Sequence, residues 1–236
     1  MLIFAILYTI FTIHLGVVLA SLYMHRYLIH RQYTMNPRLE SVMRVLYWFL
    51  FETVSTAFVV QHRKHHVFSD SNKDPHTPRF GYWSLLKCCL VPSFFRSYKI
   101  DTSPEDLSRY GGELPVGFVE KHPRLGPFLF LLLTVTLFGW LGILIWLVHL
   151  FVVNFLTITT ITVFGHSIGY RNFDNKDLTK NISPVGILCV GEEMHNNHHN
   201  NSRQCNFAVK KYEFDLGYQY LRLLNKFNLI QFKKEL

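Results

Sequence analysis

Three histidine clusters, each beside a long apolar segment, constrain how this chain can fold. They read HRYLIH at 25–30, HRKHH at 62–66 and HNNHH at 195–199, and they hold eight of the 13 histidines. Imidazole is a ligand suited to iron, zinc, copper and nickel. Eight imidazoles exceed the four ligands of a single zinc ion, but they suit two metal ions that each keep an open position. We therefore expect the fold to bring the clusters together at one two-metal site.

The spacing inside two of the clusters favours one helix face. In the trios at 62–66 and 195–199, a helix that turns by about 100° per residue keeps the three histidines within an arc of roughly 100°. His25 and His30 are five residues apart, which an ideal α-helix separates by roughly 140°. They can serve one site only if they straddle the cavity or if the helix ends between them. We expect this cluster where an apolar helix leaves the membrane.

The distribution of charge predicts membrane-spanning helices. The first 24 residues carry no Lys, Arg, Asp or Glu, and the apolar run continues to His25. Because the positive leading region of a secretory signal is missing, we expect a retained transmembrane helix at 1–24. A second uncharged stretch covers 127–168. Its length of roughly 60 Å as a helix allows two passes through a hydrocarbon core of ~30 Å. A transmembrane hairpin over 125–168, turning near 139–142, is expected.

The segment 45–60 is apolar, yet Glu52 and three hydroxyl side chains interrupt it. A single crossing here would put the first two histidine clusters on opposite sides of the membrane. We therefore expect 40–61 to form an interfacial or re-entrant helix whose polar side chains face protein or water. Basic residues flank the clusters on their common side, which predicts a cytoplasmic site and an N-terminus outside.

Two polar regions, 67–124 and 169–236, are expected to form a cap over the metal site. The predicted fold class is an all-α integral membrane protein with a single domain over 1–236. It would have about three transmembrane helices, one interfacial or re-entrant helix, and a helical cytoplasmic cap that holds the metal ions. A multi-pass location follows, in the cytoplasmic membrane if the source is bacterial, with the active site on the cytoplasmic face.

The formal net charge of +8 has two explanations. The first, which we favour, is retention of basic residues on the cytoplasmic side. The second is attraction of anionic lipid headgroups or of the phosphates of an acyl thioester. Nucleic-acid binding is not expected, because the basic residues border apolar segments rather than forming a patch of their own. The four cysteines form no C-x-x-C motif, which suits a reduced cytoplasmic face and argues against a fused rubredoxin or ferredoxin module.

The clusters H-x-x-x-x-H, H-x-x-H-H and H-x-x-H-H, in this order and between apolar segments, resemble the membrane fatty-acid desaturases. The likeness is to the acyl-CoA Δ9 (stearoyl-CoA desaturase-like) type and to its bacterial branch. Flanking residues that carry it are DPH at 74–76, GYRNF at 169–173, GEE at 191–193 and YEFD at 212–215. The resemblance implies two iron ions, with O₂ as co-substrate, that take two hydrogens from adjacent carbons of a saturated acyl chain. The product would carry a cis double bond at the Δ9 position.

The resemblance also implies a ninth ligand, His166, at the end of the last apolar run. The implied metal ligands are His25, His30, His62, His65, His66, His166, His195, His198 and His199. The family usually has an asparagine four residues before the ninth ligand, holding a metal-bound water, where this chain has Thr162. The side chains expected to support the ligands are Thr162, Asp74, His76, Glu192, Asn196 and Asn197.

The same resemblance implies partners that the chain does not encode. No haem, flavin or iron–sulfur motif is visible, so a separate ferredoxin or cytochrome b5-like donor with its reductase would supply electrons. The substrate would be a fatty acyl thioester or the acyl chain of a phospholipid, reached among membrane lipids. Two alternatives stay open. One is hydroxylation of an acyl or alkyl chain by the same site, and the other is a membrane metal-binding or transport protein without redox chemistry.

Overall fold

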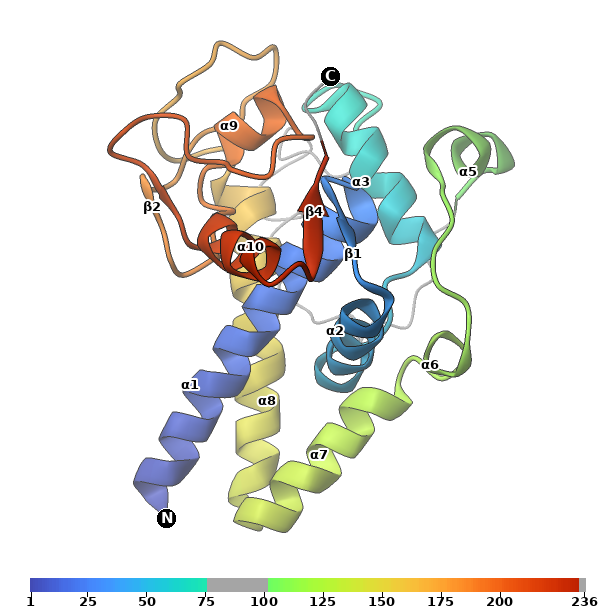
Figure 1. Cartoon of the computed structure of the whole chain (residues 1–236), viewed down its shortest axis with the longest axis vertical. Coiled ribbons are helices and arrows are strands. Elements are labelled where there is room, and N and C mark those ends of the chain that lie inside the picture. Colours follow the sequence, from blue (N-terminus) through green and yellow to red (C-terminus); the bar gives the residue numbers. More distant parts are fainter. Residues whose placement is uncertain (76–101, 234–236) are drawn as a thin grey trace.

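The computed structural model describes residues 1–75 and 102–233 (Figure 1). Helices dominate the described residues, and the strands form two small two-stranded sheets. Long helices extend toward one end of the molecule, and the short helices and strands gather at the other (Figure 1). We call the end with the short helices and strands the cap; that the long helices lie in a membrane stays a prediction.

Among the described residues, two helical rods are long and apolar enough to cross a membrane. The first joins α1 (Leu2–Leu19) to the π-helix η1 (Ala20–Ile29); it has 28 residues, and an 18-residue window of it has a mean hydropathy of 2.4. The second joins α8 (Leu141–Asn154) to the π-helix η4 (Phe155–Phe164) and reaches His166; it has 26 residues, and an 18-residue window of it has a mean hydropathy of 2.3. The outer half of α1 exposes large apolar side chains to 50% or more, as a lipid-facing helix would.

A third apolar helix, α7 (Leu125–Phe138), packs against α8 and completes a helical hairpin. The chain turns between them at Gly139, whose φ of 61° favours glycine. The two helices approach closely at Gly142, where a Cβ would lie 2.2 Å from the carbonyl oxygen of Thr134. Because α7 has 14 residues, its length of roughly 21 Å is less than a ~30 Å hydrocarbon core. The hairpin is therefore present, and a third crossing stays a prediction.

The single helix expected over 40–61 is two helices, α2 (Pro37–Leu50) and α3 (Thr56–Phe68). Each begins after a residue whose side chain accepts a hydrogen bond from a backbone N–H of the first turn, Asn36 for α2 and Ser55 for α3. The polar residues between the two helices end α2 and cap α3, which is why the apolar pattern does not continue as one helix. Whether this segment crosses the membrane stays a prediction.

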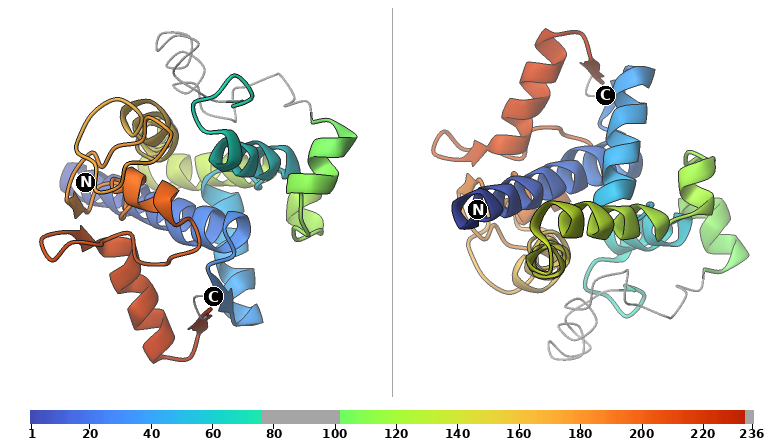
Figure 2. Two further views of the ribbon diagram at one scale, coloured as in Figure 1. Left: turned by 90° about the horizontal axis from the view of Figure 1, so that it is seen from above. Right: turned by 90° about the horizontal axis from the view of Figure 1, so that it is seen from below.

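The described residues of the cap form four short helices, α5 (Pro104–Tyr110), α6 (Phe118–Lys121), α9 (His195–Asn200) and α10 (Leu216–Lys226). Viewed from above and below, α10 and α3 lie on opposite sides of the rod formed by α1 and η1 (Figure 2). The main apolar core joins this rod to its neighbours: Leu22 of η1, Val153 of α8 and Leu221 of α10 are each at most 1% exposed.

Two short sheets join distant parts of the chain. β1 (Tyr33–Met35) pairs antiparallel with β4 (Ile230–Phe232), so the end of the described chain lies against the segment that follows η1. β2 (Val185–Gly186) pairs parallel with β3 (Phe214–Asp215) just before α10. The sheets therefore tie the C-terminal region to the membrane rod and to the loop that leads into α9.

Candidate metal centre

The nine histidines expected as ligands gather in two adjacent groups. The five-histidine cluster contains His25, His30, His62, His66 and His198, and the four-histidine cluster contains His65, His166, His195 and His199. Within each group, one nitrogen from every imidazole lies within 4.8 Å of the others, and all nine side chains are buried or half-buried. The groups touch, because the rings of His66 and His199 stack with centroids 4.2 Å apart.

The π-helical backbone of η1 brings His25 and His30 together. The helix ends at Ile29, between the two histidines, which is one of the two arrangements expected from the sequence. A backbone hydrogen bond also brings the two side chains to one face. The backbone N–H of His30 donates to the carbonyl oxygen of His25 at 3.0 Å, an i to i+5 bond. Such a bond adds a residue to the turn and returns a residue five positions later to the same face. The two Nε2 atoms lie 3.1 Å apart.

The two H-x-x-H-H trios each contribute to both clusters. In α3, the i, i+4 pair of His62 and His66 lies in the five-histidine cluster, and His65 lies in the other. In α9 the assignment is reversed, because the i, i+4 pair lies in the four-histidine cluster and His198 lies in the five-histidine cluster. The common face predicted for each trio therefore points at the boundary between the two histidine clusters, and α3 and α9 each contribute side chains to both clusters.

Carboxylates contact three imidazoles of the four-histidine cluster at the nitrogen that faces away from its centre. The Nδ1 atoms lie 2.9–3.0 Å from carboxylate oxygens in the pairs His65–Asp74, His166–Asp70 and His199–Asp177. An imidazole that donates from Nδ1 to a carboxylate keeps a lone pair on Nε2. The Nε2 atoms of His166 and His195 lie 3.1 Å apart. Convergent lone pairs of this kind suit a metal cation.

In the five-histidine cluster, three imidazole nitrogens lie so close together that hydrogen bonds cannot satisfy all of their contacts. The Nε2 atoms of His25, His30 and His62 are mutually 3.1 Å apart. A neutral imidazole nitrogen carries either a hydrogen or a lone pair, so it donates or accepts but cannot do both. Among three nitrogens in mutual contact, at least one pair therefore has two hydrogens or two lone pairs facing each other. A cation shared by the three lone pairs removes this conflict, so the residues fit a metal ion.

Burial keeps these imidazoles in the form that binds metal. It holds the pKa of His66, His198 and His199 well below the usual range, and the neighbouring histidines lower each pKa further. A buried imidazole loses hydration when it is charged, so the neutral form is favoured at neutral pH. Neutral imidazole is the form that coordinates a metal ion.

Asn196 and Asn197, which were expected to support the ligands, join α9 to neighbouring loops through hydrogen bonds. Asn196 accepts backbone N–H bonds from Asn172 and Phe173, each at 2.9 Å. The amide nitrogen of Asn197 donates to Glu213 at 3.0 Å, and its oxygen accepts from two further asparagine side chains. These bonds join α9 to two loops of the cap and fix the direction of its histidines.

The remaining expected residues have different outcomes. Asp74 contacts the imidazole of His65, as described above, and Glu192 contacts that of His25 at 2.8 Å. Thr162 is half-buried in η4, four residues before His166, and its part in holding a water stays a prediction. His76 lies outside the described residues.

Sequence reasoning missed two of the supporting carboxylates. Asp70 lies 96 positions from His166 and has a φ of 58°, and Asp177 lies in the polar segment between η4 and α9. Neither belongs to a histidine motif. The closest signal was the position of Asp70, four residues before Asp74, which makes the end of α3 a source of two acids beside the second trio.

Comparison with known proteins agrees with this geometry. The model of the fatty acid desaturase family matches residues 2–212. A hex-5-enoyl-[acyl-carrier protein] acetylenase of Moorena producens (strain JHB) is 27% identical, over 89% of this chain and 70% of its own length. Delta-9 acyl-lipid desaturase 1 of Arabidopsis thaliana is 27% identical, over 85% of this chain and 65% of its own.

The sn-1 stearoyl-lipid 9-desaturase of Anabaena variabilis is also 27% identical, over 85% of this chain and 72% of its own length. The chain therefore spans roughly two thirds of each of these relatives. The family match covers the whole segment that holds the two clusters, from the start of α1 past His199. The resemblance seen in the motifs is confirmed: this chain belongs to the fatty acid desaturase family, whose members are oxidoreductases that act on fatty acids.

Proposed function

We propose that the chain is an O₂-dependent, di-iron fatty acyl desaturase that introduces a cis double bond at the Δ9 position of a saturated acyl chain. The observation that carries the proposal is the pair of buried histidine clusters with convergent lone pairs. Two iron ions bound there would supply the activation of O₂ and the oxidising power that removes hydrogen from unactivated methylenes. With two electrons and two protons from outside, each turnover yields one double bond and two waters.

In this proposal the chain's own side chains hold and orient the metal ions. The nine histidines named above are the ligands, five at one position and four at the other. Asp70, Asp74, Asp177 and Glu192 orient four of the rings through Nδ1. Because these carboxylates have their own hydrogen-bond donors, the imidazole planes are fixed before metal arrives.

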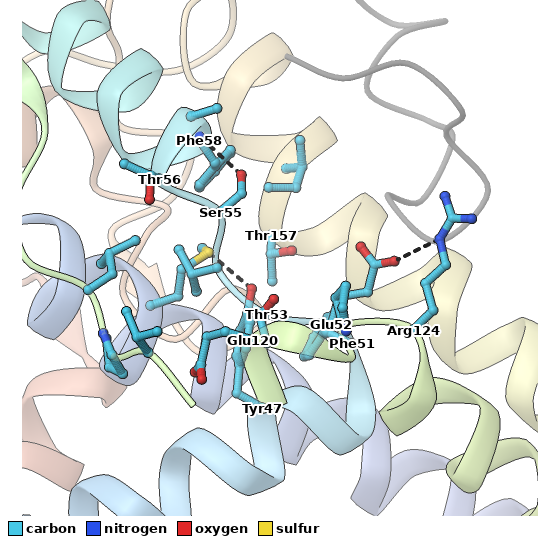
Figure 3. Close-up of a pocket in the computed structure, with 18 of the residues that line it drawn as sticks. Tyr47, Phe51, Glu52, Thr53, Ser55, Thr56, Phe58, Glu120, Arg124 and Thr157 are labelled. Carbon is cyan, nitrogen blue, oxygen red and sulfur yellow. Dashed lines mark hydrogen bonds and ion pairs between the residues drawn. The ribbon is translucent and has the colours of Figure 1, made fainter. Parts of the chain in front are cut away.

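A cavity of about 980 Å³ beside the five-histidine cluster is suited to the acyl chain (Figure 3). Its lining includes Met24, which precedes His25, and Phe58, whose ring centroid lies 6.1 Å from that of His62. Tyr47 and Phe51 line it from α2 and from the link to α3. We propose that the acyl chain lies here with the reacting carbons near Met24 and Phe58. The apolar side chains at this part of the cavity would contact the acyl chain and keep water away from it.

Polar residues lie at another part of this cavity. Glu52 and Thr53 of the α2–α3 link line it, and Arg124 lies 3.8 Å from Glu52 (Figure 3). That the polar residues of 45–60 line this cavity supports the expectation that they face protein or water. We propose that this polar part holds the end of the substrate that carries its head group.

The names of the relatives support two substrate classes, an acyl-carrier-protein thioester and an acyl-lipid. We propose that the electron donor is a separate ferredoxin or cytochrome b5-like protein with its reductase. The site would lie on the cytoplasmic face of a membrane that the chain crosses about three times.

Expression in a host that lacks its own desaturase tests the function. Total lipids are analysed for chain length and double-bond position, with the His166→Ala variant as the inactive control. A new cis double bond that depends on His166 supports the proposal. A hydroxylated acyl chain in its place would establish the hydroxylase alternative. Metal binding with neither product nor O₂ consumption, in the presence of a reductant, would favour a metal-binding or transport protein.

A further inference from the structure

The C-terminal part of the cap carries surface charge of a single sign. From 201 to 233, all six lysine and arginine side chains are exposed. The two acids of this segment, Glu213 and Asp215, are buried, and they accept hydrogen bonds from Tyr170 and Arg26, which belong to other parts of the chain. The surface of 201–233 is therefore positive, which favours an anionic partner.

Exposed apolar side chains lie beside the basic ones on α10. The i, i+4 pair Arg222 and Lys226 is exposed, and the i, i+4 pair Leu223 and Phe227 is 53% and 64% exposed. At about 100° per residue these four side chains occupy an arc of roughly 140°. Leu221, on the opposite side of the helix, is 0% exposed. A helix that exposes adjoining basic and apolar stripes is typical of one that lies in a membrane interface.

The sheet before α10 repeats this combination. Val185 of β2 and Phe214 of β3 are cross-strand partners, and they are 47% and 39% exposed. Leu188, which follows β2, is 72% exposed, and Lys210 and Lys211, which precede β3, are exposed. Large apolar side chains and positive charge therefore occur together on both sides of the junction between β3 and α10.

The helix α10 lies where the exposed apolar half of α1 ends. The hydroxyl of Tyr220 lies 2.9 Å from Nε2 of His14 on α1. About one turn before this contact, Phe11 is 63% exposed, and about one turn after it, Val17 is 1% exposed. α10 also runs across the rod formed by α1 and η1 and not along it (Figure 1, Figure 2). If α1 crosses a membrane, α10 lies near the level of the lipid headgroups.

We propose that α10 and the β2–β3 sheet bind the surface of an anionic membrane. Leu223, Phe227 and Leu188 enter the boundary of the acyl chains, and the basic side chains contact lipid phosphates. The inference rests on the proposed function only for the placement of α1 in a membrane. An acidic protein would also suit the positive charge, but the position of α10 at the end of the exposed half of α1 favours lipid.

Photo-cross-linking to lipid tests the proposed contact. The full chain is placed in nanodiscs with equal amounts of phosphatidylcholine and phosphatidylglycerol, and mass spectrometry identifies lipid adducts. Benzoylphenylalanine in place of Leu223 or Leu188 should form such adducts. The matched control is Leu107, a leucine of α5 that is 41% exposed; it should form none, because α5 lies farther than α10 from the free end of α1 (Figure 1). Phe11 of α1 serves as the positive control for a membrane-spanning helix.

Single charge removals test the choice of lipid. Arg222→Gln and Lys226→Gln should each lower the ratio of phosphatidylglycerol to phosphatidylcholine adducts at position 223 by up to roughly 5-fold, the effect of one basic residue near an anionic surface. Arg109→Gln removes one exposed charge from α5 and should leave this ratio unchanged. The same ratio in the parent, Arg222→Gln and Lys226→Gln would overturn the role given to the charges.

The cross-linked positions also separate this inference from the proposed function. Adducts at position 11 but not at 223 or 188 would overturn the inference and leave the membrane placement of α1 intact, whereas adducts at none of these positions would overturn both. A raised KM for a reduced ferredoxin in Lys226→Gln, without lipid adducts at position 223, would assign the surface to a protein instead. Desaturation is scored separately by lipid analysis, and lipid adducts in a protein that forms no double bond would refute the proposed function alone.

Discussion

The guanidinium of Arg26 donates to both carboxylate oxygens of Asp215, each at 3.1 Å, across 189 positions of sequence. Both side chains are 0% exposed. Arg26 also donates to the backbone carbonyls of Val190 and Cys205, and it lies 3.9 Å from the ring centroid of Phe207. The pair joins the helix that carries the first histidine cluster to the start of α10.

Asp215→Asn should therefore destabilise the protein strongly. The substitution removes the carboxylate that accepts two hydrogen bonds from the buried guanidinium and leaves, among the described residues, only Glu192, 3.6 Å from Nε, as a counter-charge. Breaking a buried ion pair in this way typically costs ~3–5 kcal/mol. Denaturant or thermal unfolding in detergent measures the loss. The control is Arg222→Ala, because Arg222 is exposed and bonds to Gln219 on the same helix; it should change stability by less than ~0.5 kcal/mol. An Asp215→Asn variant as stable as the parent would show that the ion pair is not needed.

Purified protein that retains its metal should contain about two iron ions per chain, since each cluster offers at least three imidazoles to an ion. His166→Ala should lower the ratio toward one without unfolding the helices, because it removes one side of the four-histidine cluster. Metal analysis together with circular dichroism checks both statements. A stable ratio of one in a fully active parent would contradict the two-metal site.

The hydroxyl of Thr162 is expected to hold a water beside the metal position. Threonine offers one hydroxyl on a shorter arm than asparagine, and Thr162→Val removes it at nearly unchanged volume. Activity should fall by ~10–100-fold in Thr162→Val and much less in Thr162→Ser. Turnover measured with saturating reductant separates the two variants. Equal activity of Thr162→Val and the parent would mean that this residue only packs.

The segment 45–60 should not cross the membrane, because both of its ends lead to clusters that meet. Single cysteines in place of Asn36 and Val67, both exposed, should react from the same side of sealed vesicles. A cysteine in place of Trp140, which is 80% exposed at the tip of the hairpin, should react from the opposite side. Labelling of positions 36 and 67 from opposite sides would refute the topology.

Glu213 should make the cap sensitive to acid. Burial raises the pKa of its carboxyl, but hydrogen bonds from Tyr170, from the backbone of Lys210 and Val209, and from Asn197 outweigh burial and hold this pKa below its usual value. A pKa lower in the folded state gives stability that is present above the unfolded value of about 4.3 and is lost as pH falls through the folded value.

Unfolding measured from pH 7 to pH 3 should therefore show a loss of stability at the acid end that Glu213→Gln reduces. Glu105→Gln, an exposed acid in the first turn of α5, is the control and should leave the pH profile unchanged. A parent and a Glu213→Gln variant with the same slope against pH would contradict the role given to this carboxylate.

The histidines that form the two clusters could be predicted because the spacing within each motif is local and matches a family pattern. The apolar rods at 2–29 and 141–166 followed from uncharged stretches of the sequence. The division of each trio between two clusters could not be derived, because a 100° arc does not say how many ions lie in front of it. The π-helical turn at His30 was missed because the angles assumed an α-helix throughout.

The carboxylates that contact the histidines could not be predicted from the sequence, for a different reason. Asp70 meets His166 only when the residues after η4 lie beside the residues after α3, and Asp177 meets His199 only when the loop after η4 folds back on α9. Their sequence neighbourhoods resemble those of any polar loop. The break between α2 and α3 was similarly masked by hydrophobic composition, although Ser55 is a common helix cap that pointed to it.

Both histidine clusters take side chains from α9. A polypeptide is made from its N-terminus at about 5–20 residues per second, so the ribosome releases the last of these imidazoles only after the hairpin at 125–164 has been synthesised. Neither histidine cluster can close on an unfinished chain. A truncated or stalled product therefore lacks part of both clusters, and in the proposed enzyme the order of biosynthesis would keep O₂ chemistry from starting before the hairpin has been made.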